Sequence, residues 1–147
     1  MGAATSQASF GDPIAVAAAS GDEAAVGAWL DSGGQVDALF ENPGGGVPLV
    51  SVLFLASVNG HLRIVDLVLK RGAGVDVPNS AGGTALMWSA FHGKPAVVRR
   101  LLSAGASLDI IDSHGCTALD YAKAQPNNAS CNDCMAAIRG ALVSRVS

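Results

Sequence analysis

The residues whose types and spacing come closest to a chemical site are three cysteines and a histidine near the carboxyl end. Cys131 and Cys134 form a Cys-x-x-Cys pair, and His114 and Cys116 lie upstream of them. Because thiolate and imidazole groups suit tetrahedral zinc, one hypothesis is a four-ligand zinc site. Another is a redox-active pair at the start of the last helix, where the helix dipole would lower a thiol pKa. The β-α-β context of a redox pair is absent, so we favour Cys134 as a small core residue and Cys131 as a loop thiol.

No other set of residues has the spacing of a catalytic or cofactor site. No serine, histidine and acid arrangement stands out, and His61, His92 and His114 lie in three separate segments. The glycines at 44–46 are not followed by the Lys and Ser/Thr of a phosphate-binding loop. The sequence therefore predicts a protein that is not an enzyme and that has neither a cofactor nor a small-molecule substrate.

The amino end contains one candidate modification site. Residues 1–6 fit the N-myristoylation pattern, with Gly2 as acceptor and Ser6 at the hydroxyl position, although an ordinary chain start is the alternative. No basic region precedes an apolar one, so a secretory signal is not predicted. The apolar stretch Val47–Val58 contains a proline and is too short to span a bilayer. We therefore expect reduced thiols, a cytoplasmic or nuclear location, and membrane contact only if Gly2 is lipidated.

Composition and charge narrow the class of partner. The chain has 147 residues, enough for one domain, and half of them are apolar, which argues against disorder. Residues 1–62 carry six acidic residues and no Lys or Arg, whereas residues 63–147 carry nine basic and six acidic residues. This predicts an acidic amino end and a mildly basic carboxyl end, which would suit a polarised partner. The basic surface expected of nucleic-acid binding is missing, so no nucleic-acid partner is predicted.

Glycines recur along the chain at a fixed spacing. Gly21, Gly60 and Gly93 each stand 12 residues before another glycine and 16 residues before an aspartate. Between these landmarks, pairs of aliphatic residues recur at a spacing that forms one stripe on a helix. The pairs are Ala25-Val26 with Trp29-Leu30, Ile64-Val65 with Val68-Leu69, and Val97-Val98 with Leu101-Leu102. The chain is therefore predicted to be a stack of similar helix pairs, of which residues 79–111 are the most regular.

This regular unit resembles an ankyrin repeat. Its segment Thr84-Ala85-Leu86-Met87 is similar to the Thr-Pro-Leu-His turn of that family, and Gly93 and Gly105-Ala106 match the glycines that end its two helices. Residues 79–82 and 112–115 resemble the family's hairpin turn. The resemblance implies an all-α ankyrin-repeat solenoid of four helix-turn-helix units with β-hairpin-like tips. The chain departs from the pattern at the turn, whose proline survives only as Pro13 and whose histidine is absent, so some hydrogen bonds of the turn must be replaced.

The same landmarks predict the domain organisation. The predicted segments are a disordered tail at 1–11, a repeat domain at 12–143 with repeats at about 12–38, 48–78, 79–111 and 112–143, a glycine-rich insertion within 38–50, and a frayed end at 144–147. An elongated loop at 127–133 is expected before the last helix. Because this fold places tips and inter-helix loops at opposite ends of a helix pair, the four zinc-ligand candidates are not expected to meet.

In the family that the chain resembles, partners bind to the hairpin tips and to the concave face of the first helices. The matching positions, with the base of the insertion added, are Phe40, Glu41, Val58, Asn59, Ser80, Ala81, Gly83, Trp88, Phe91, His92, Ser113, His114, Cys116 and Gln125. Phe91 and His92 are the expected anchors, because aromatic residues dominate interface energetics. Trp88 and Tyr121 occupy equivalent positions in consecutive repeats and are expected to be able to stack on each other. Trp88 is predicted either as core or as a partly exposed member of the site. Phe40 is predicted either to fold back on its repeat or to await a partner.

These observations together predict non-catalytic protein–protein recognition. The chain would bind another protein as an adaptor, an inhibitor or an assembly subunit. Two alternatives remain at this point: a structural subunit of a large complex, and a zinc- or redox-responsive module that uses Cys131 and Cys134.

Overall fold

The structure, a computed structural model, describes residues 12–43, 49–125 and 127–146. The predicted tail at 1–11, the lipidation candidate Gly2 and the glycine-rich centre of the insertion lie outside these residues. The elements of the described part are α1 (Pro13–Ser20), α2 (Glu23–Asp31), β1 (Leu39–Glu41), β2 (Leu49–Ser51), α3 (Val52–Val58), α4 (Leu62–Lys70), α5 (Ala85–Phe91), α6 (Pro95–Ser103), α7 (Ala118–Lys123) and α8 (Ala129–Val146).

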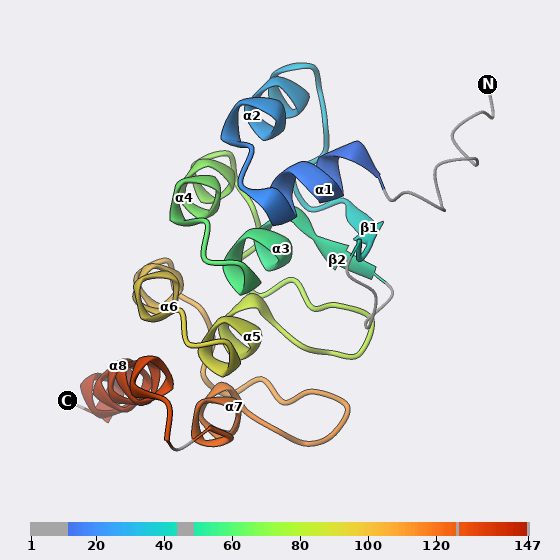
Figure 1. Ribbon diagram of the computed structural model, residues 1–147. Coiled ribbons are helices and arrows are strands. Elements are labelled where there is room, and N and C mark those ends of the chain that lie inside the picture. Colours follow the sequence, from blue (N-terminus) through green and yellow to red (C-terminus); the bar gives the residue numbers. More distant parts are fainter. Residues whose placement is uncertain (1–11, 44–48, 126, 147) are drawn as a thin grey trace.

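The helices form two columns (Figure 1). The first helices of the pairs, α1, α3, α5 and α7, pack one on the next, and so do the second helices α2, α4, α6 and α8. The loops and strands that connect successive pairs project from the side of the first helices. The predicted all-α solenoid of four helix pairs is therefore confirmed, and we call the projecting connections tips 2, 3 and 4 after the helix pair that each precedes.

Local sequence explains where the helices start and turn. The hydroxyl oxygens of Thr84 and Thr117 accept hydrogen bonds from the N–H groups of Met87 and Asp120 and so cap α5 and α7. Between the two helices of a pair, Gly93 has a φ of 67°, in the left-handed region that glycine enters without steric cost. The equivalent Gly21 and Gly60 do the same, which accounts for the spacing of these glycines.

The core is continuous along the stack. Every residue of Val52–Ser57 in α3 is buried, because α1 and α5 cover this helix on two sides. The second helices bury one stripe each, and these stripes contain the predicted aliphatic pairs. A buried aliphatic side chain contributes about 1.5–3 kcal/mol, whereas an exposed ion pair contributes about 0–1 kcal/mol. Apolar stacking therefore holds the repeats together.

The tips are joined by backbone hydrogen bonds. In tip 2, β1 and β2 pair antiparallel, with Phe40 opposite Val50. The N–H of Ser80 in tip 3 donates to the carbonyl of Leu49 at 3.3 Å, and the N–H of Ser113 in tip 4 donates to the carbonyl of Ala81 at 3.0 Å. Tips 3 and 4 thus each donate one hydrogen bond to a backbone carbonyl of the tip before them.

Several acidic residues of one repeat contact the next repeat, so the charge pattern along the sequence is not the charge pattern on the surface. Asp31 pairs with Arg71 at 2.6 Å, and Asp66 pairs with Arg100 at 2.6 Å. Asp37 accepts a bond from the N–H of Gly74, as Asp76 does from that of Ser107, both at 2.9 Å. Of the six acidic residues in the first half of the sequence, Glu23 and Asp31 pair with Arg63 and Arg71 of the second half, and the recurring aspartate links neighbouring repeats.

The carboxyl end differs from two predictions. Residues 129–133 are helical, so the expected elongated loop is wrong: Asn128 Oδ1 accepts bonds from the N–H groups of Ser130 and Cys131 and starts α8 there. The helix also continues to Val146, beyond the predicted boundary at 143.

Candidate partner-binding site

One aromatic cluster is formed by four side chains of α5, its C-terminal cap and α7: Trp88, Phe91, His92 and Tyr121. The ring centre of Trp88 lies 5.6 Å from that of Phe91, 6.0 Å from that of His92 and 5.3 Å from that of Tyr121. Phe91 and Tyr121 also meet edge to face, with centres 6.1 Å apart. The structure therefore joins the predicted anchors Phe91 and His92 to Trp88 and adds Tyr121 to them.

Helical and repeat spacing bring these rings together. Residues 88, 91 and 92 are separated by three and four positions and lie on one face of α5. Tyr121 follows Trp88 by 33 residues and occupies the same position one repeat later. Trp88, Phe91 and Tyr121 are half-buried and His92 is exposed, while Phe54 of α3 is buried beneath Trp88. The cluster therefore rests on the core and leaves part of its ring surface exposed to solvent.

The charge of this cluster is neutral at ordinary pH. Partial burial, and next the positive charge of Lys94, lower the pKa of His92.

The end of α5 is bound by side chains of the next repeat. Gln125, which the sequence predicted as a binding residue, donates from its Nε2 to the carbonyl of Phe91 at 3.0 Å. Cys131 Sγ donates to the same carbonyl at 3.3 Å. The end of α5 is thus held by two side chains of the next repeat.

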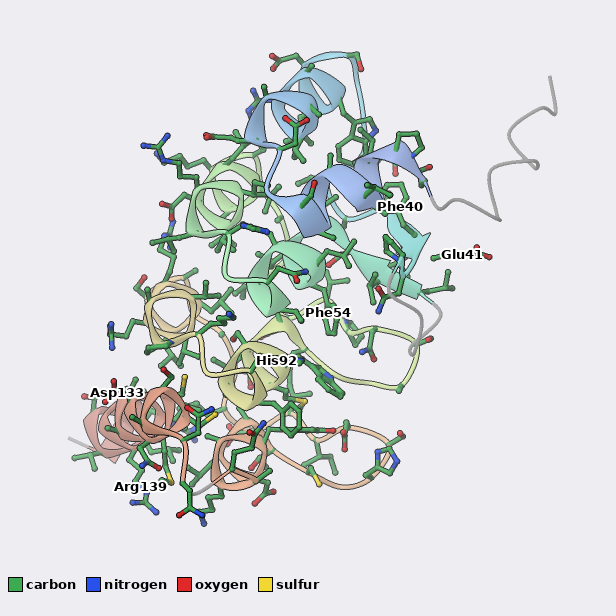
Figure 2. The ribbon with its side chains drawn as sticks, viewed as in Figure 1. Phe40, Glu41, Phe54, His92, Asp133 and Arg139 are labelled. Carbon is green, nitrogen blue, oxygen red and sulfur yellow. The ribbon has the colours of Figure 1, made fainter. Side chains whose placement is uncertain are left out.

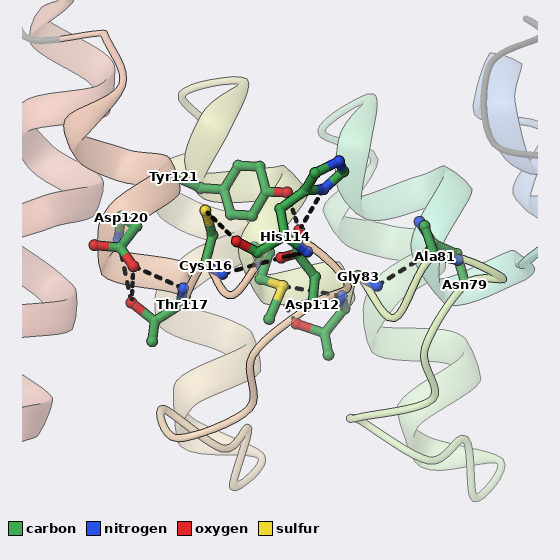
Figure 3. Close-up of polar contacts among 11 residues, drawn as sticks. Asn79, Ala81, Gly83, Asp112, His114, Cys116, Thr117, Asp120 and Tyr121 are labelled. Atoms are coloured by element: carbon green, nitrogen blue, oxygen red, sulfur yellow. Dashed lines mark hydrogen bonds and ion pairs between the residues drawn. The ribbon is translucent and has the colours of Figure 1, made fainter.

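Tip 4 is organised around a buried carboxylate (Figure 3). Asp112 Oδ1 accepts bonds from the N–H groups of His114 at 2.9 Å and Cys116 at 3.0 Å, and Oδ2 accepts one from the Tyr121 hydroxyl. Burial alone would raise the pKa of Asp112, but these hydrogen bonds hold it below its ordinary value. Burial, and then the bond to Asp112 and its charge, raise the pKa of Tyr121. Asp112 therefore ties the tip to the aromatic cluster.

Tip 3 repeats this arrangement with an amide. Asn79 Oδ1 accepts bonds from the N–H groups of Ala81 and Gly83, both at 2.9 Å, while its buried Nδ2 has no hydrogen-bond partner among the described residues. Gly83 is required next to it, because a Cβ there would lie 2.6 Å from Trp88 Nε1. Sequence reasoning missed Asn79 and Asp112, although each stands nine residues before the aromatic residue of its repeat.

The remaining predicted site residues lie on the tips and at the ends of the first helices. Ser80, Ser113 and His114 are exposed on tips 3 and 4, and Ala81 is half-buried there. At the end of the α3 helix Val58 is half-buried and Asn59 is exposed. These residues are therefore within reach of a partner, with contacts that stay a prediction.

The base of the insertion places its two predicted residues differently. The ring of Phe40 packs edge to face on Trp29, with centres 5.8 Å apart, so it folds back on its own repeat. Glu41 is exposed, and its side chain points away from the ribbon (Figure 2). The structure does not join either residue to the aromatic cluster, which lies on the later repeats.

The cysteines do not form the chemical site that their spacing suggested. Cys131 and Cys134 are both buried in α8, so the prediction of a loop thiol at 131 is wrong, whereas Cys134 is a core residue as expected. Burial raises the pKa of both thiols, that of Cys134 to about 11, which outweighs the expected effect of the helix dipole. Within the described residues, no three His, Cys, Asp or Glu side chains are grouped so as to hold a metal ion.

The helices were also compared with the requirements of a membrane span. None in the described part of the chain combines the length and apolar character needed to cross a bilayer.

Comparison with known proteins agrees with the helix-pair architecture. The family model for ankyrin repeats (3 copies) matches residues 14–110 and residues 53–138. The probable E3 ubiquitin-protein ligase XBOS33 of Oryza sativa subsp. japonica is 51% identical over 45 residues, which are 31% of this chain and 9% of the rice protein. The chain thus spans a small part of this curated relative. The residues joined in the aromatic cluster fall inside both family matches, except that Tyr121 falls only in the second.

Proposed function

Because the chain belongs to the ankyrin-repeat family, we propose that it binds another protein through the concave face of its first helices and the neighbouring tips, without catalysing a reaction. Ankyrin repeats are protein–protein interaction modules. The observation that carries the proposal for this chain is the aromatic cluster, whose rings are partly exposed on an otherwise small-residue face. Aromatic rings with a buried base and an exposed edge are typical of the residues that carry binding energy.

Phe91 is the centre of the proposed surface. At the positions equivalent to Phe91, the neighbouring repeats have Val58 and Ala124, so the phenyl ring is the largest side chain of its row. The ring is braced by Trp88 and Tyr121 and needs little ordering when a partner binds. Since His92 is neutral at ordinary pH, the centre of the surface favours an apolar or hydrogen-bonding contact over a charged one.

Within protein recognition, we assign the roles of adaptor, inhibitor or assembly subunit, including a structural subunit of a larger complex. The name of the rice relative describes that protein, and the 45 matched residues support only a shared repeat segment. Buried thiols with raised pKa values argue against a redox-responsive module.

The proposal predicts that replacing the two anchors, Phe91 and His92, weakens the affinity for the partner protein. We expect Phe91→Ala with His92→Ala to remain folded, because the bonds from Gln125 and Cys131 are made to the backbone carbonyl of residue 91. Proteins captured from native cells by the immobilised chain, then titrated individually, should bind the double variant at least about tenfold more weakly.

A matched control distinguishes this site from the rest of the surface. Lys70→Ala removes an exposed side chain of similar size on a second helix and should leave affinity unchanged. Equal affinity of the wild-type protein and the double variant, with unchanged circular dichroism, would place binding elsewhere.

A further inference from the structure

We propose that the tips bind a basic amphipathic helix of the partner protein, laid across the tips with one apolar residue in every seven against Leu39, Pro78 and Ile111. This inference rests on the proposed function and names the chemistry of the partner at the tips.

Charge is divided between the two sides of the molecule, and the division differs from the one along the sequence. The first helices and the tips comprise residues 12–20, 33–59, 73–92 and 106–125, and they contain seven acidic residues and one basic residue, Lys123. The other eight Lys and Arg residues lie in the second helices or directly at their ends. The tips therefore contribute acidic residues and no Lys or Arg of their own, and such a surface attracts a basic segment.

Most of these carboxylates accept hydrogen bonds from neutral groups. Asp37 and Asp76 accept their bonds from backbone N–H groups, which are neutral and so leave the negative charge in place. Hydrogen bonds within tip 4 and α7 lower the pKa values of Asp112 and Asp120, so both remain ionised. Asp109 pairs with Arg145 at 3.1 Å, and Asp112 Oδ2 lies 3.7 Å from His114 Nδ1, a contact that is an ion pair only when the imidazole is protonated.

A row of apolar residues runs across the same surface. Leu39, Pro78 and Ile111 each follow the recurring aspartate by two residues, and all three are exposed. Leu39 is 44% and Ile111 58% exposed, although large aliphatic side chains are usually buried. Exposure at three equivalent positions is not explained by the stacking of the repeats, since nothing in the described part covers them.

The spacing between neighbouring residues of this apolar row fits a helical segment of the partner better than an extended one. The bonds Asp37 to Gly74 and Asp76 to Ser107 have the same length and the same place in their repeats, so the row is regular. Stacked helices lie about 8–10 Å apart, and seven residues of α-helix rise about 10.5 Å. Side chains on one face of a strand recur at about 6.6–6.8 Å, which does not match. A helix of about 15 residues spans all three positions.

Glu41 indicates where a cation of the partner lies. It is opposite Leu49 in the β1–β2 pair, and strand alternation places it on the same face as Leu39. Both Leu39 and Leu49 are exposed, and no described residue pairs with the Glu41 carboxylate. A Lys or Arg of the partner next to the residue on Leu39 would therefore meet an unpaired carboxylate on an apolar background.

The experiment is a selection of peptides from a displayed library of random 18-residue sequences against the immobilised full chain. We expect the enriched peptides to be basic, to have apolar residues at seven-residue intervals, and to bind more weakly as salt is raised. Leu39→Ser with Ile111→Ser, and separately Glu41→Lys, should each weaken binding by about tenfold or more. Val143→Ser changes an aliphatic residue that is 69% exposed on α8 and serves as the matched control.

The outcomes separate this inference from the proposed function. Enriched peptides that keep their affinity for Leu39→Ser with Ile111→Ser, but lose it for Phe91→Ala with His92→Ala, overturn the inference and leave the proposed function standing. Enriched peptides without net positive charge also overturn the inference, and the proposed function stands if their binding depends on Phe91 and His92. If no peptide is enriched, or if binding depends on neither pair, this inference fails, whereas the proposed function is decided separately by the titration of captured partner proteins. Circular dichroism confirms in each case that the variant is folded.

Discussion

Replacing Asp112 with Asn tests the link between tip 4 and the aromatic cluster, and Tyr121 reports on it directly because it is the chain's one tyrosine. The amide Oδ1 can still accept the bonds from His114 and Cys116, as the equivalent Asn79 does in tip 3. The change removes the negative charge and the Oδ2 acceptor beside the Tyr121 hydroxyl. The turn should therefore persist while the hydroxyl loses its anionic partner.

The size of the effect follows from the causes of the raised pKa of Tyr121, which are burial first and then the Asp112 carboxylate. A hydrogen bond to a charged group contributes about 1.5–3 kcal/mol, and one pKa unit corresponds to about 1.4 kcal/mol. Because Tyr121 is half-buried, solvent weakens the hydrogen bond to Asp112, and its contribution lies at the lower end of this energy range. Tyr121 should titrate about one pH unit lower in Asp112→Asn, and still above the ordinary value of about 10 because burial remains.

The assay is the ultraviolet absorbance of tyrosinate against pH, with circular dichroism at the same pH values to show that the helices persist. Titration at the same pH in the wild-type protein and in Asp112→Asn would refute the link. Urea unfolding supplies a second readout at acid pH. Since the folded pKa of Asp112 is lowered, its stabilisation is present above the ordinary carboxyl pKa of about 4 and is lost as pH falls through the folded value. The stability difference between the two proteins should therefore shrink in that range.

Two further predictions follow from packing and from burial. Gly83→Ala should lower the free energy of unfolding by about 1–3 kcal/mol, because the new Cβ would lie 2.6 Å from Trp88 Nε1. Gly140→Ala is the control: this glycine lies in an exposed turn of α8, where a Cβ would meet nothing within 4 Å, so the change should raise the free energy of unfolding by up to about 1 kcal/mol. Urea unfolding measures both values. Iodoacetamide should modify the half-buried Cys116 before the buried Cys134, whose pKa is raised to about 11; faster labelling of Cys134 in the native protein, read by mass spectrometry of its peptides, would contradict its burial.

The fold was largely readable from the sequence, because its signals are local and repeat at one interval. Gly21, Gly60 and Gly93 recur where the backbone must turn between helices, and that demand does not depend on distant residues. The carboxyl end was harder. An elongated loop is expected at 127–133, but Asn128 is a helix cap and starts α8 at Ala129.

The candidate site was only partly readable, for a different physical reason. Helical spacing put Trp88, Phe91 and His92 on one face, yet burial of part of each ring depends on neighbours from other repeats. The role of Asp112 was not read from the sequence because its partner Tyr121 lies on the next helix. The charge asymmetry was read along the chain, whereas packing converts it into an asymmetry between the tips and the second helices.

The aromatic cluster and the tips are therefore connected surfaces: Asp112 of tip 4 binds the Tyr121 hydroxyl, and Gly83 of tip 3 lies against the Trp88 ring. Successive tips share single backbone bonds, such as that from Ser113 to Ala81, whereas successive helices share the apolar core. Apolar residues of the tips, such as Leu108 and Ile110, also pack against the core, and the polar bonds of tip 4 converge on Asp112. Because the Tyr121 hydroxyl binds the same carboxylate, a helix that displaced tip 4 would also move a ring of the cluster. A partner that engages both surfaces would then bind them cooperatively, and Asp112→Asn should weaken that cooperativity while leaving each surface intact.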